Sequence, residues 1–263
     1  MTNFESKTAV ITGASRGIGK AVAEALVDRC TNVVIGDLLD EQGQSVVDDL
    51  NKRAQRKVAV YQHADATKYA DLKRLFEVAA SEFGGVDIAI FNAGVAKDAN
   101  ALFTPMDGGV IKGNKVALMH MVNQGGVIIN TASSAGVFPP NFLNAYGATK
   151  SAVVGWTRSL GYLQRACNVR VSAVCPYWVE TELIQMAGDP NRYCPTLVRL
   201  SPKTEMQTVV DAFLKCITGE YEGGSIVLAL PDGLRQDLGS PIPAVHDRPP
   251  DINTSVGQGA WLT

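Results

Sequence analysis

The chain has 263 residues, of which 46% are hydrophobic and 19% are charged, and its net charge is −2. This composition predicts a globular protein with a substantial core, and the absence of a basic cluster argues against a nucleic-acid or membrane-surface partner. No stretch approaches the roughly 20 apolar residues of a membrane-spanning helix, and the N-terminal residues lack the apolar core of a signal peptide.

The cysteines and histidines indicate neither a disulfide framework nor a metal site. The five cysteines are odd in number, widely scattered and without a C-x-x-C pair, which favours free thiols in a reducing compartment. The three histidines are also far apart, so no metal-binding pair is indicated. We expect a cytoplasmic, metal-free protein.

Short apolar runs alternate with segments of helical periodicity along most of the chain. Seven runs rich in branched residues predict buried strands at residues 8–11, 32–35, 58–61, 88–91, 127–129, 169–174 and 226–229. Helical spacing appears in segments such as residues 19–29, 68–83 and 147–165. The alternation predicts an α/β fold: a single doubly wound, Rossmann-like domain with a seven-stranded parallel sheet over residues 1–230. An irregular, proline-rich tail is expected over residues 231–263.

A glycine-rich turn joins the first predicted strand to the first predicted helix. Glycine there lets the backbone approach a pyrophosphate, and the amides of the helix N-terminus can point at it. Turns often need glycine, so the strand–turn–helix setting carries the inference rather than the glycines alone. The residues expected to bind a dinucleotide are Gly13, Ser15, Arg16, Gly17, Ile18 and Gly19.

Asp37 lies just after the second predicted strand. A carboxylate there can accept hydrogen bonds from both hydroxyls of an adenosine ribose and repels the 2′-phosphate of NADP, so Asp37 favours NAD. Arg16 could instead attract a phosphorylated ribose. A buried carboxylate should outweigh a mobile surface arginine, because desolvation magnifies the repulsion. The alternative is that Asp37 is a helix cap or a solvated loop acid.

Polar and small residues follow the next two predicted strands. Asp65 and Ala66 come after the third strand, and Asn92, Ala93 and Gly94 come after the fourth. Ligands of open α/β sheets bind at the carboxyl ends of strands, so we expect these residues to contact adenine and the cofactor backbone. The alternative is turn chemistry, because Asp, Asn and Gly all stabilise turns.

Tyr146 and Lys150 lie four residues apart in a predicted helix, so their side chains share a face. A phenol has a pKa of about 10 and is a poor base at neutral pH, but a fixed neighbouring cation favours its phenolate. Such a pair can take a proton from an alcohol while a dinucleotide accepts hydride. The alternative is a packed tyrosine beside a solvated lysine. The glycine turn, together with Ser133 upstream, favours the catalytic interpretation.

In combination these motifs resemble the short-chain dehydrogenase/reductase family over roughly residues 7–230. The resemblance rests on the glycine turn, Asn92-Ala93-Gly94, Ser133, Tyr146-x-x-x-Lys150 and Pro176-x-x-Val179-x-Thr181. Within the family the chain looks most like the NAD-dependent hydroxyprostaglandin dehydrogenase branch. That similarity lies in Ile128-Ile129-Asn130 and in the stretch from Cys175 to Thr181.

The resemblance implies that Tyr146 is the catalytic acid/base and that Ser133 hydrogen-bonds the substrate oxygen. Ser134 is the other candidate serine, but Ser133 has the family's spacing of thirteen residues to the tyrosine. Lys150 would bind the nicotinamide ribose while stabilising the phenolate. Val179 and Thr181 would contact the nicotinamide carboxamide. By the same resemblance we expect a homodimer or homotetramer packed through the helix of Tyr146.

Two departures from the family pattern stand out. The family usually has a catalytic asparagine in the helix after the fourth strand; alignment places Met106 there, and Asn114 falls about two turns further along. Pro105 also interrupts the preceding segment. Tyr177 stands where the family commonly has glycine. Without the asparagine, protons could still escape through Lys150 and the ribose hydroxyl to water.

The predicted activity is reversible oxidation of a secondary alcohol with NAD. Aromatic residues in the segments that the family folds around the substrate suggest an apolar or ring-bearing alcohol, although such residues are more often core: Phe138, Tyr177, Trp178 and Tyr193. Residues 182–200 are a candidate lid. Two alternatives stay open: an NADPH-dependent carbonyl reductase, and an NAD(H)-binding sensor or structural protein with little catalysis.

Overall fold

The computed structural model describes residues 4–94, 108–140, 143–187 and 195–239. Its strands are β1 (Thr8–Thr12), β2 (Asn32–Asp37), β3 (Ala59–His63), β4 (Ile88–Phe91), β5 (Gly126–Thr131), β6 (Val169–Pro176), β7 (Ile226–Leu230) and β8 (Gly233–Asp237). Its longer helices are α1 (Gly17–Val27), α2 (Asp40–Ala54), α3 (Tyr69–Phe83), α4 (Gly109–Met121), α5 (Asn144–Ser159) and α9 (Met206–Thr218). Three short helices are α6 (Leu163–Cys167), α7 (Glu182–Ala187) and α8 (Pro195–Leu200), and a 3₁₀ turn, η2, spans Ser134–Gly136.

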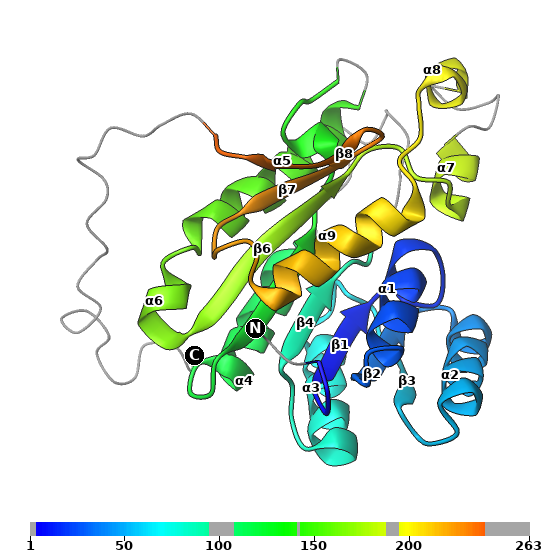
Figure 1. The fold of residues 1–263 in the computed structure, drawn as a ribbon, viewed down its shortest axis with the longest axis vertical. Coiled ribbons are helices and arrows are strands. Elements are labelled where there is room, and N and C mark those ends of the chain that lie inside the picture. The colour runs from blue at the N-terminus through cyan, green and yellow to red at the C-terminus, as the bar shows by residue number, and fades with distance from the viewer. Residues whose placement is uncertain (1–3, 95–107, 141–142, 188–194, 240–263) are drawn as a thin grey trace.

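The strands form one sheet in the order β3-β2-β1-β4-β5-β6-β7-β8, in which β1 to β7 are parallel (Figure 1). Side chains alternate between the two faces of each strand. Ile11 and Ile35 pack under α1, α2 and α9, whereas Val10 and Val34 pack against α3 and α4. Helix α9 crosses in front of the sheet in Figure 1, and α4 and α5 lie behind it. The expected doubly wound α/β fold is confirmed.

The sheet differs from the expectation at its end. The seven expected parallel strands are present, and an eighth, β8, pairs with β7 in the antiparallel direction. The irregular tail therefore does not begin at residue 231, because residues 231–232 form a tight hairpin turn between Leu230 and Gly233. The strand is then held from the side by an ion pair between Arg158 and Asp237. Residues 240–263 lie outside the described residues.

The helix expected over residues 147–165 is two helices. Helix α5 begins earlier, at Asn144, and ends at Ser159, after which the chain turns before α6. A Cβ at Gly161 would stand 3.0 Å from the carbonyl oxygen of Gly223. The break thus brings the backbone at Gly161 close against the loop before β7, a contact that helical periodicity does not encode.

The strand order reverses between β1 and β4, since β1 has β2 on one side and β4 on the other. The crossovers from β1 lead outward to β2 and β3, and the chain then returns past β1 to β4. At such a switch point the loops after the two strands separate and leave a crevice at their carboxyl ends. The glycine turn follows β1, and Asn92 follows β4, so both lie at this edge.

Candidate active site

Two glycines of the turn, Gly13 and Gly19, are packed too tightly for any larger residue. Gly13 has φ +70° and its N–H donates to the carbonyl of Gly36 at 2.7 Å. A Cβ at Gly13 would come within 2.6 Å of the Cα of Ala93, and a Cβ at Gly19 within 2.3 Å of the carbonyl oxygen of Gly13. Glycine at these two positions therefore allows the first turn of α1 to pack directly against the backbone of the loop.

The N-terminus of α1 is open to an anionic group. Its N-cap residue, Arg16, makes no side-chain capping hydrogen bond, and the first turn of the helix contains no acidic residue. Gly17 has φ +58°, and Ile18 packs on the core beneath. Uncapped first-turn amides and the helix dipole favour a phosphate at this end, which fits the dinucleotide expected from the sequence.

Asn92 links the glycine turn to the end of β4 through hydrogen bonds. Its carboxamide donates to the carbonyl oxygen of Gly13 at 2.8 Å. The backbone N–H groups of Asn92 and Ala93 donate to the hydroxyl of Thr12 at 3.1 and 3.2 Å. The sequence predicted Asn92 and Ala93 as cofactor contacts. The structure gives both a role in fixing the turn, which leaves contact with a cofactor as a prediction.

Asp37 ends β2 with its carboxylate held in one orientation. Oδ2 accepts from the N–H of Ser15 at 3.0 Å, and Oδ1 accepts from the N–H of Leu38 at 2.7 Å and of Leu39 at 3.3 Å. These amides balance the negative charge and preorganise it beside the glycine turn. Asp37 is not a helix cap, because the N-cap of α2 is Leu39.

Tyr61 supports this loop, although no motif in the sequence singles it out. The hydroxyl of Tyr61 lies 2.8 Å from the carbonyl oxygen of Asp37 and 2.7 Å from Oδ1 of Asp40, and it can donate to one of them at a time. Burial, followed by the neighbouring carboxylate of Asp40, raises the pKa of Tyr61, so it stays a neutral donor. Nδ1 of His63 approaches the same carboxylate oxygen at 2.7 Å. The cluster joins residues of β2 and α2 to residues of β3 that are more than 20 positions away in sequence, so no local pattern predicts it.

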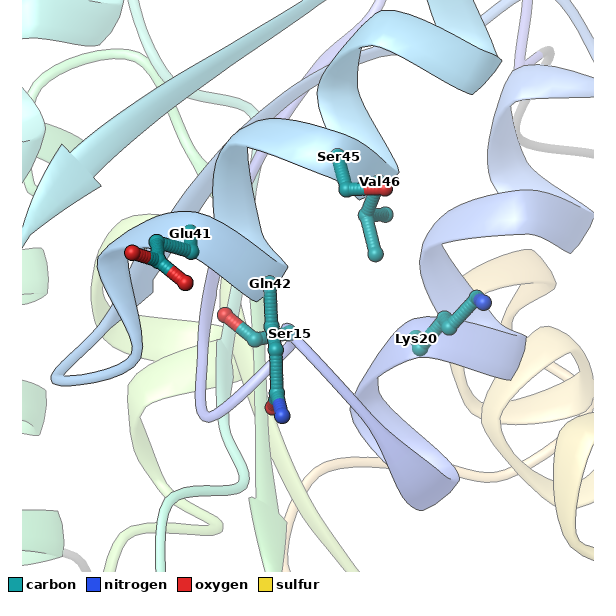
Figure 2. A pocket seen from close by; sticks show the side chains of 6 residues that line it. All are labelled: Ser15, Lys20, Glu41, Gln42, Ser45 and Val46. Carbon is teal, nitrogen blue, oxygen red and sulfur yellow. The ribbon is translucent and has the colours of Figure 1, made fainter.

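An open pocket lies between α1 and α2 next to this loop (Figure 2). It is lined by Ser15, Lys20, Glu41, Gln42, Ser45 and Val46. In Figure 2, Lys20 lies on α1 across the gap from the residues of α2, with its side chain directed away from them, and Ser15 belongs to the loop that leads into α1. Because Ser15 also bonds Asp37, the pocket adjoins the place where the ribose of adenosine is expected.

Asp65 and Ala66 have other partners in this structure. The carboxylate of Asp65 accepts hydrogen bonds from the N–H and the hydroxyl of Thr67 at 2.9 and 2.7 Å, and these bonds lower its pKa. Ala66 packs closely on the start of α4, since a Cβ at Gly109 would stand 2.8 Å from its carbonyl oxygen. The geometry at Asp65 matches the turn chemistry that was the alternative for this position.

Lys150 and Tyr146 lie on the same face of α5. The ammonium of Lys150 is 5.7 Å from the centroid of the Tyr146 ring and donates to the carbonyl oxygen of Thr131 at 2.9 Å. It also lies beside Gly94, because a Cβ there would be 3.9 Å from Nζ. The lysine thus stands between the tyrosine and the carboxyl ends of β4 and β5.

Ser133 precedes the η2 turn, which packs against α5. The hydroxyl of Ser133 accepts from the N–H of Ala135 at 3.2 Å, and the residue is 9% exposed. Ser151 on α5 donates to the carbonyl oxygen of Gly136 at 2.9 Å. The turn that carries Ser133 is therefore fastened to the helix that carries Tyr146. The alternative serine, Ser134, lies inside the turn.

The segment after β6 approaches the glycine turn. Thr181 Cγ2 lies 3.5 Å from where a Cβ at Gly17 would stand, and Val179 is buried in the core beneath. Arg16 forms an ion pair with Glu182, the first residue of α7. The two residues expected near nicotinamide are thus brought to the same edge as the glycine turn. The ion pair between Arg16 and Glu182 connects their segment to the turn, although the two residues are 166 positions apart in sequence.

Asn114 is fully buried and does not serve as a free amide at this edge. Its carboxamide exchanges hydrogen bonds with Asn130 at 2.7 and 3.1 Å and accepts from the indole of Trp156 at 3.0 Å. Asn130 donates in turn to Thr157 at 3.0 Å. This network ties α4, β5 and α5 together. Met106, which aligns with the asparagine usual in the family, lies outside the described residues.

Aromatic residues expected near a substrate are partly placed. The rings of Tyr177 and Trp178 meet edge to face at 6.2 Å, and Phe138 is 64% exposed. Tyr193 lies outside the described residues. In the part of the chain that the structure describes, no cluster of metal-ligating side chains occurs and no helix is long and apolar enough to cross a membrane.

The chain is similar to known proteins in sequence and in fold. The family model for short chain dehydrogenases matches residues 7–191. A 15-hydroxyprostaglandin dehydrogenase [NAD(+)] from Macaca fascicularis is 33% identical over 191 residues, which cover 70% of this chain and 72% of that protein. A cis-4-hydroxycyclohexanecarboxylate dehydrogenase from Sinomonas cyclohexanicum is 34% identical over 242 residues, 85% and 95% of the two chains.

Among solved structures, a short-chain type dehydrogenase/reductase from Mycobacterium marinum superposes with a TM-score of 0.77 and 28% identity, over 87% of this chain and 96% of that one. The fold agrees with the sequence relationship. This chain belongs to the short-chain dehydrogenase family of oxidoreductases.

Proposed function

We propose that this protein oxidises a secondary alcohol to a ketone, reversibly, with NAD as the hydride carrier and Tyr146 as the acid/base. The observation that carries the proposal is the position of Lys150, whose ammonium lies beside the Tyr146 ring and beside Gly94 at the cofactor edge. The ammonium places positive charge beside the ring whose hydroxyl is proposed to exchange a proton with the alcohol.

The lysine is held in place by the sheet. The carbonyl oxygen of Thr131 accepts from its ammonium at 2.9 Å, so the charge has a fixed direction and does not move freely in solvent. Ser133 lies two residues beyond Thr131 at the same strand end, where its hydroxyl can hydrogen-bond a substrate oxygen. Bound NAD⁺ would supply the hydride acceptor, which no side chain of a protein can replace.

Asp37 supports NAD rather than NADP. Its carboxylate is oriented by three backbone N–H groups and lies next to Ser15 of the glycine turn. A negative charge fixed there accepts hydrogen bonds from ribose hydroxyls and repels a 2′-phosphate. The name of the Macaca fascicularis relative, which specifies NAD(+), supports the same choice.

The proposed substrate is a small apolar or ring-bearing alcohol. The Tyr177–Trp178 pair and the exposed Phe138 provide apolar surface for it, and the Sinomonas cyclohexanicum relative is named for a hydroxylated ring compound. We also propose a cytoplasmic homodimer or homotetramer, on the family resemblance alone.

The test is a substrate panel with both cofactors. Purified protein is incubated with cyclic and linear secondary alcohols and either NAD⁺ or NADP⁺, and reduced cofactor is followed at 340 nm. NADH formation from at least one alcohol, faster than NADPH formation, is the expected result. Faster turnover with NADP(H) would instead indicate a carbonyl reductase. Binding of NADH without turnover of any alcohol or ketone would indicate a sensor or structural protein.

A further inference from the structure

Arg16 occupies a position from which it could serve two different partners. It follows Ser15, whose N–H bonds the Asp37 carboxylate, so its long side chain starts next to the expected ribose. An arginine near that ribose can bind the 2′-phosphate of NADP. In this structure the guanidinium is paired with Glu182 of α7 instead.

The ion pair draws Arg16 to the side of the turn that faces α7. Thr181, next to Glu182, lies against Gly17, so this side of the turn is occupied by the segment after β6. The pocket between α1 and α2 lies on the side of the turn that faces α2, and Arg16 does not line it (Figure 2). Lys20 is the cation of its lining, and its ammonium is 3.9 Å from the carboxylate of Glu24.

We propose that Glu182 is a specificity-determining residue, which keeps Arg16 away from the ribose edge and so strengthens the preference for NAD that Asp37 establishes. The inference rests on the proposed dinucleotide function. The preference for NAD then has two parts. The carboxylate of Asp37 repels a 2′-phosphate, and the carboxylate of Glu182 keeps Arg16 from binding that phosphate.

The expected effect is modest because the pair is exposed. The side chains of Arg16 and Glu182 are 42% and 54% exposed, and exposed ion pairs change equilibria by roughly two- to five-fold. Removing the Glu182 charge should therefore release Arg16 at a small cost in stability. The gain should appear for the cofactor that carries a 2′-phosphate and not for the one that lacks it.

The test measures dissociation constants of NADH and NADPH by fluorescence titration, without any substrate. Four proteins are compared: the unaltered chain, Glu182→Gln, Arg16→Gln and the double variant. We expect Glu182→Gln to raise the affinity for NADPH relative to NADH by roughly two- to five-fold. In the Arg16→Gln background the same change should have no effect, because the arginine to be released is absent.

Glu180→Gln is the matched control. Glu180 lies two residues earlier in the same segment and is also exposed, but its carboxylate approaches Lys203 at 4.0 Å. The Glu180→Gln substitution removes the same charge as Glu182→Gln and should leave the ratio of NADPH affinity to NADH affinity unchanged. An equal rise in the ratio for Glu180→Gln would assign the effect to overall charge and overturn the proposal.

Two further outcomes are decisive. An unchanged ratio in Glu182→Gln, or a loss of NADPH affinity greater than five-fold in Arg16→Gln alone, would overturn the role of Glu182 while leaving the proposed function intact. Failure of the unaltered chain to bind either dinucleotide would instead remove the proposed function itself.

Discussion

The ammonium of Lys150 lies 5.7 Å from the centroid of the Tyr146 ring, with the two side chains on one face of α5. The same ammonium donates to the carbonyl oxygen of Thr131, whose hydroxyl donates in turn to Asn92 at 3.4 Å. Asn92 holds the glycine turn through the carbonyl oxygen of Gly13. A continuous chain of contacts therefore connects the proposed acid/base to the turn that is proposed to hold the cofactor.

Replacement of Lys150 by glutamine should reduce kcat by about 10²–10⁴-fold, because the positive charge beside the proposed acid/base Tyr146 is lost. The affinity for NADH should fall by much less. Steady-state kinetics and a binding titration on the same preparation measure both quantities. Lys115→Gln, at an exposed position on α4, is the control and should retain full activity. A Lys150→Gln protein as active as this control would exclude a role for the ammonium in proton transfer.

Replacement of Gly13 by alanine should destabilise the protein and weaken NADH binding. The left-handed backbone at φ +70° alone costs an L-residue about 1–2 kcal/mol, and the new Cβ would stand 2.6 Å from the Cα of Ala93. Gly155→Ala provides the contrast, since a Cβ on this exposed helical residue meets nothing within 4 Å. That change should stabilise by roughly 0.5–1 kcal/mol. Urea denaturation of the two variants checks the opposite signs; equal effects would contradict the packing described for the turn.

Replacement of Asn114 by alanine should lower the free energy of unfolding by about 1–3 kcal/mol for each buried partner left unsatisfied. The partners are Asn130 and the indole of Trp156, which are joined through its carboxamide. Asn123→Ala, at an exposed position just after α4, should change stability by no more than about 0.5 kcal/mol. Chemical denaturation measures both variants. A loss at Asn114 no larger than that at Asn123 would show that the network does not hold α4 to α5.

Buried thiols predict a loss of stability at alkaline pH. Burial raises the pKa of Cys216 from its ordinary 9.0 to about 12, and burial does the same for Cys175. Below about pH 9 these thiols are protonated in both states, so their burial has no pH-dependent cost. Between about pH 9 and 12 only the unfolded thiol ionises, and each thiol should lower the free energy of unfolding by about 1 kcal/mol per pH unit.

Urea denaturation at pH 8, 9 and 10 tests the sign of this dependence. The decline with pH should be shallower in Cys216→Ala than in the unaltered protein, whereas Cys30→Ala, at an exposed position, should leave the slope unchanged. Identical slopes in all three proteins would mean that the Cys216 thiol is not desolvated in the native state.

Much of the fold follows from local pattern. The seven parallel strands lie within a few residues of the predicted runs, because a strand buried on both faces must be short and apolar throughout. The glycine turn could also be predicted from the sequence, because it is a contiguous segment between a strand and a helix. Strand β8 was not, because its sequence, Gly233-Leu234-Arg235-Gln236-Asp237, carries one large apolar residue and forms by pairing with β7.

The sequence predicted that candidate site residues lie together only where they are close in the chain. Tyr146 and Lys150 share a face because of helix geometry alone. The role of Tyr61 beside Asp37, and the ion pair between Arg16 and Glu182, depend on elements that only folding brings together. Charged and hydroxyl groups of this kind are spread over most of the surface, so no pattern in the sequence singles out these partners.

Single-turnover kinetics of Tyr146→Phe test the central claim most directly. The variant removes one hydroxyl and keeps the ring beside Lys150, so the fold and the affinity for NADH should be retained within about two-fold, while formation of NADH from an alcohol falls by 10²-fold or more, as roughly expected for loss of a general base. A folded Tyr146→Phe protein that binds NADH and still oxidises the alcohol at the rate of the unaltered enzyme would contradict the account.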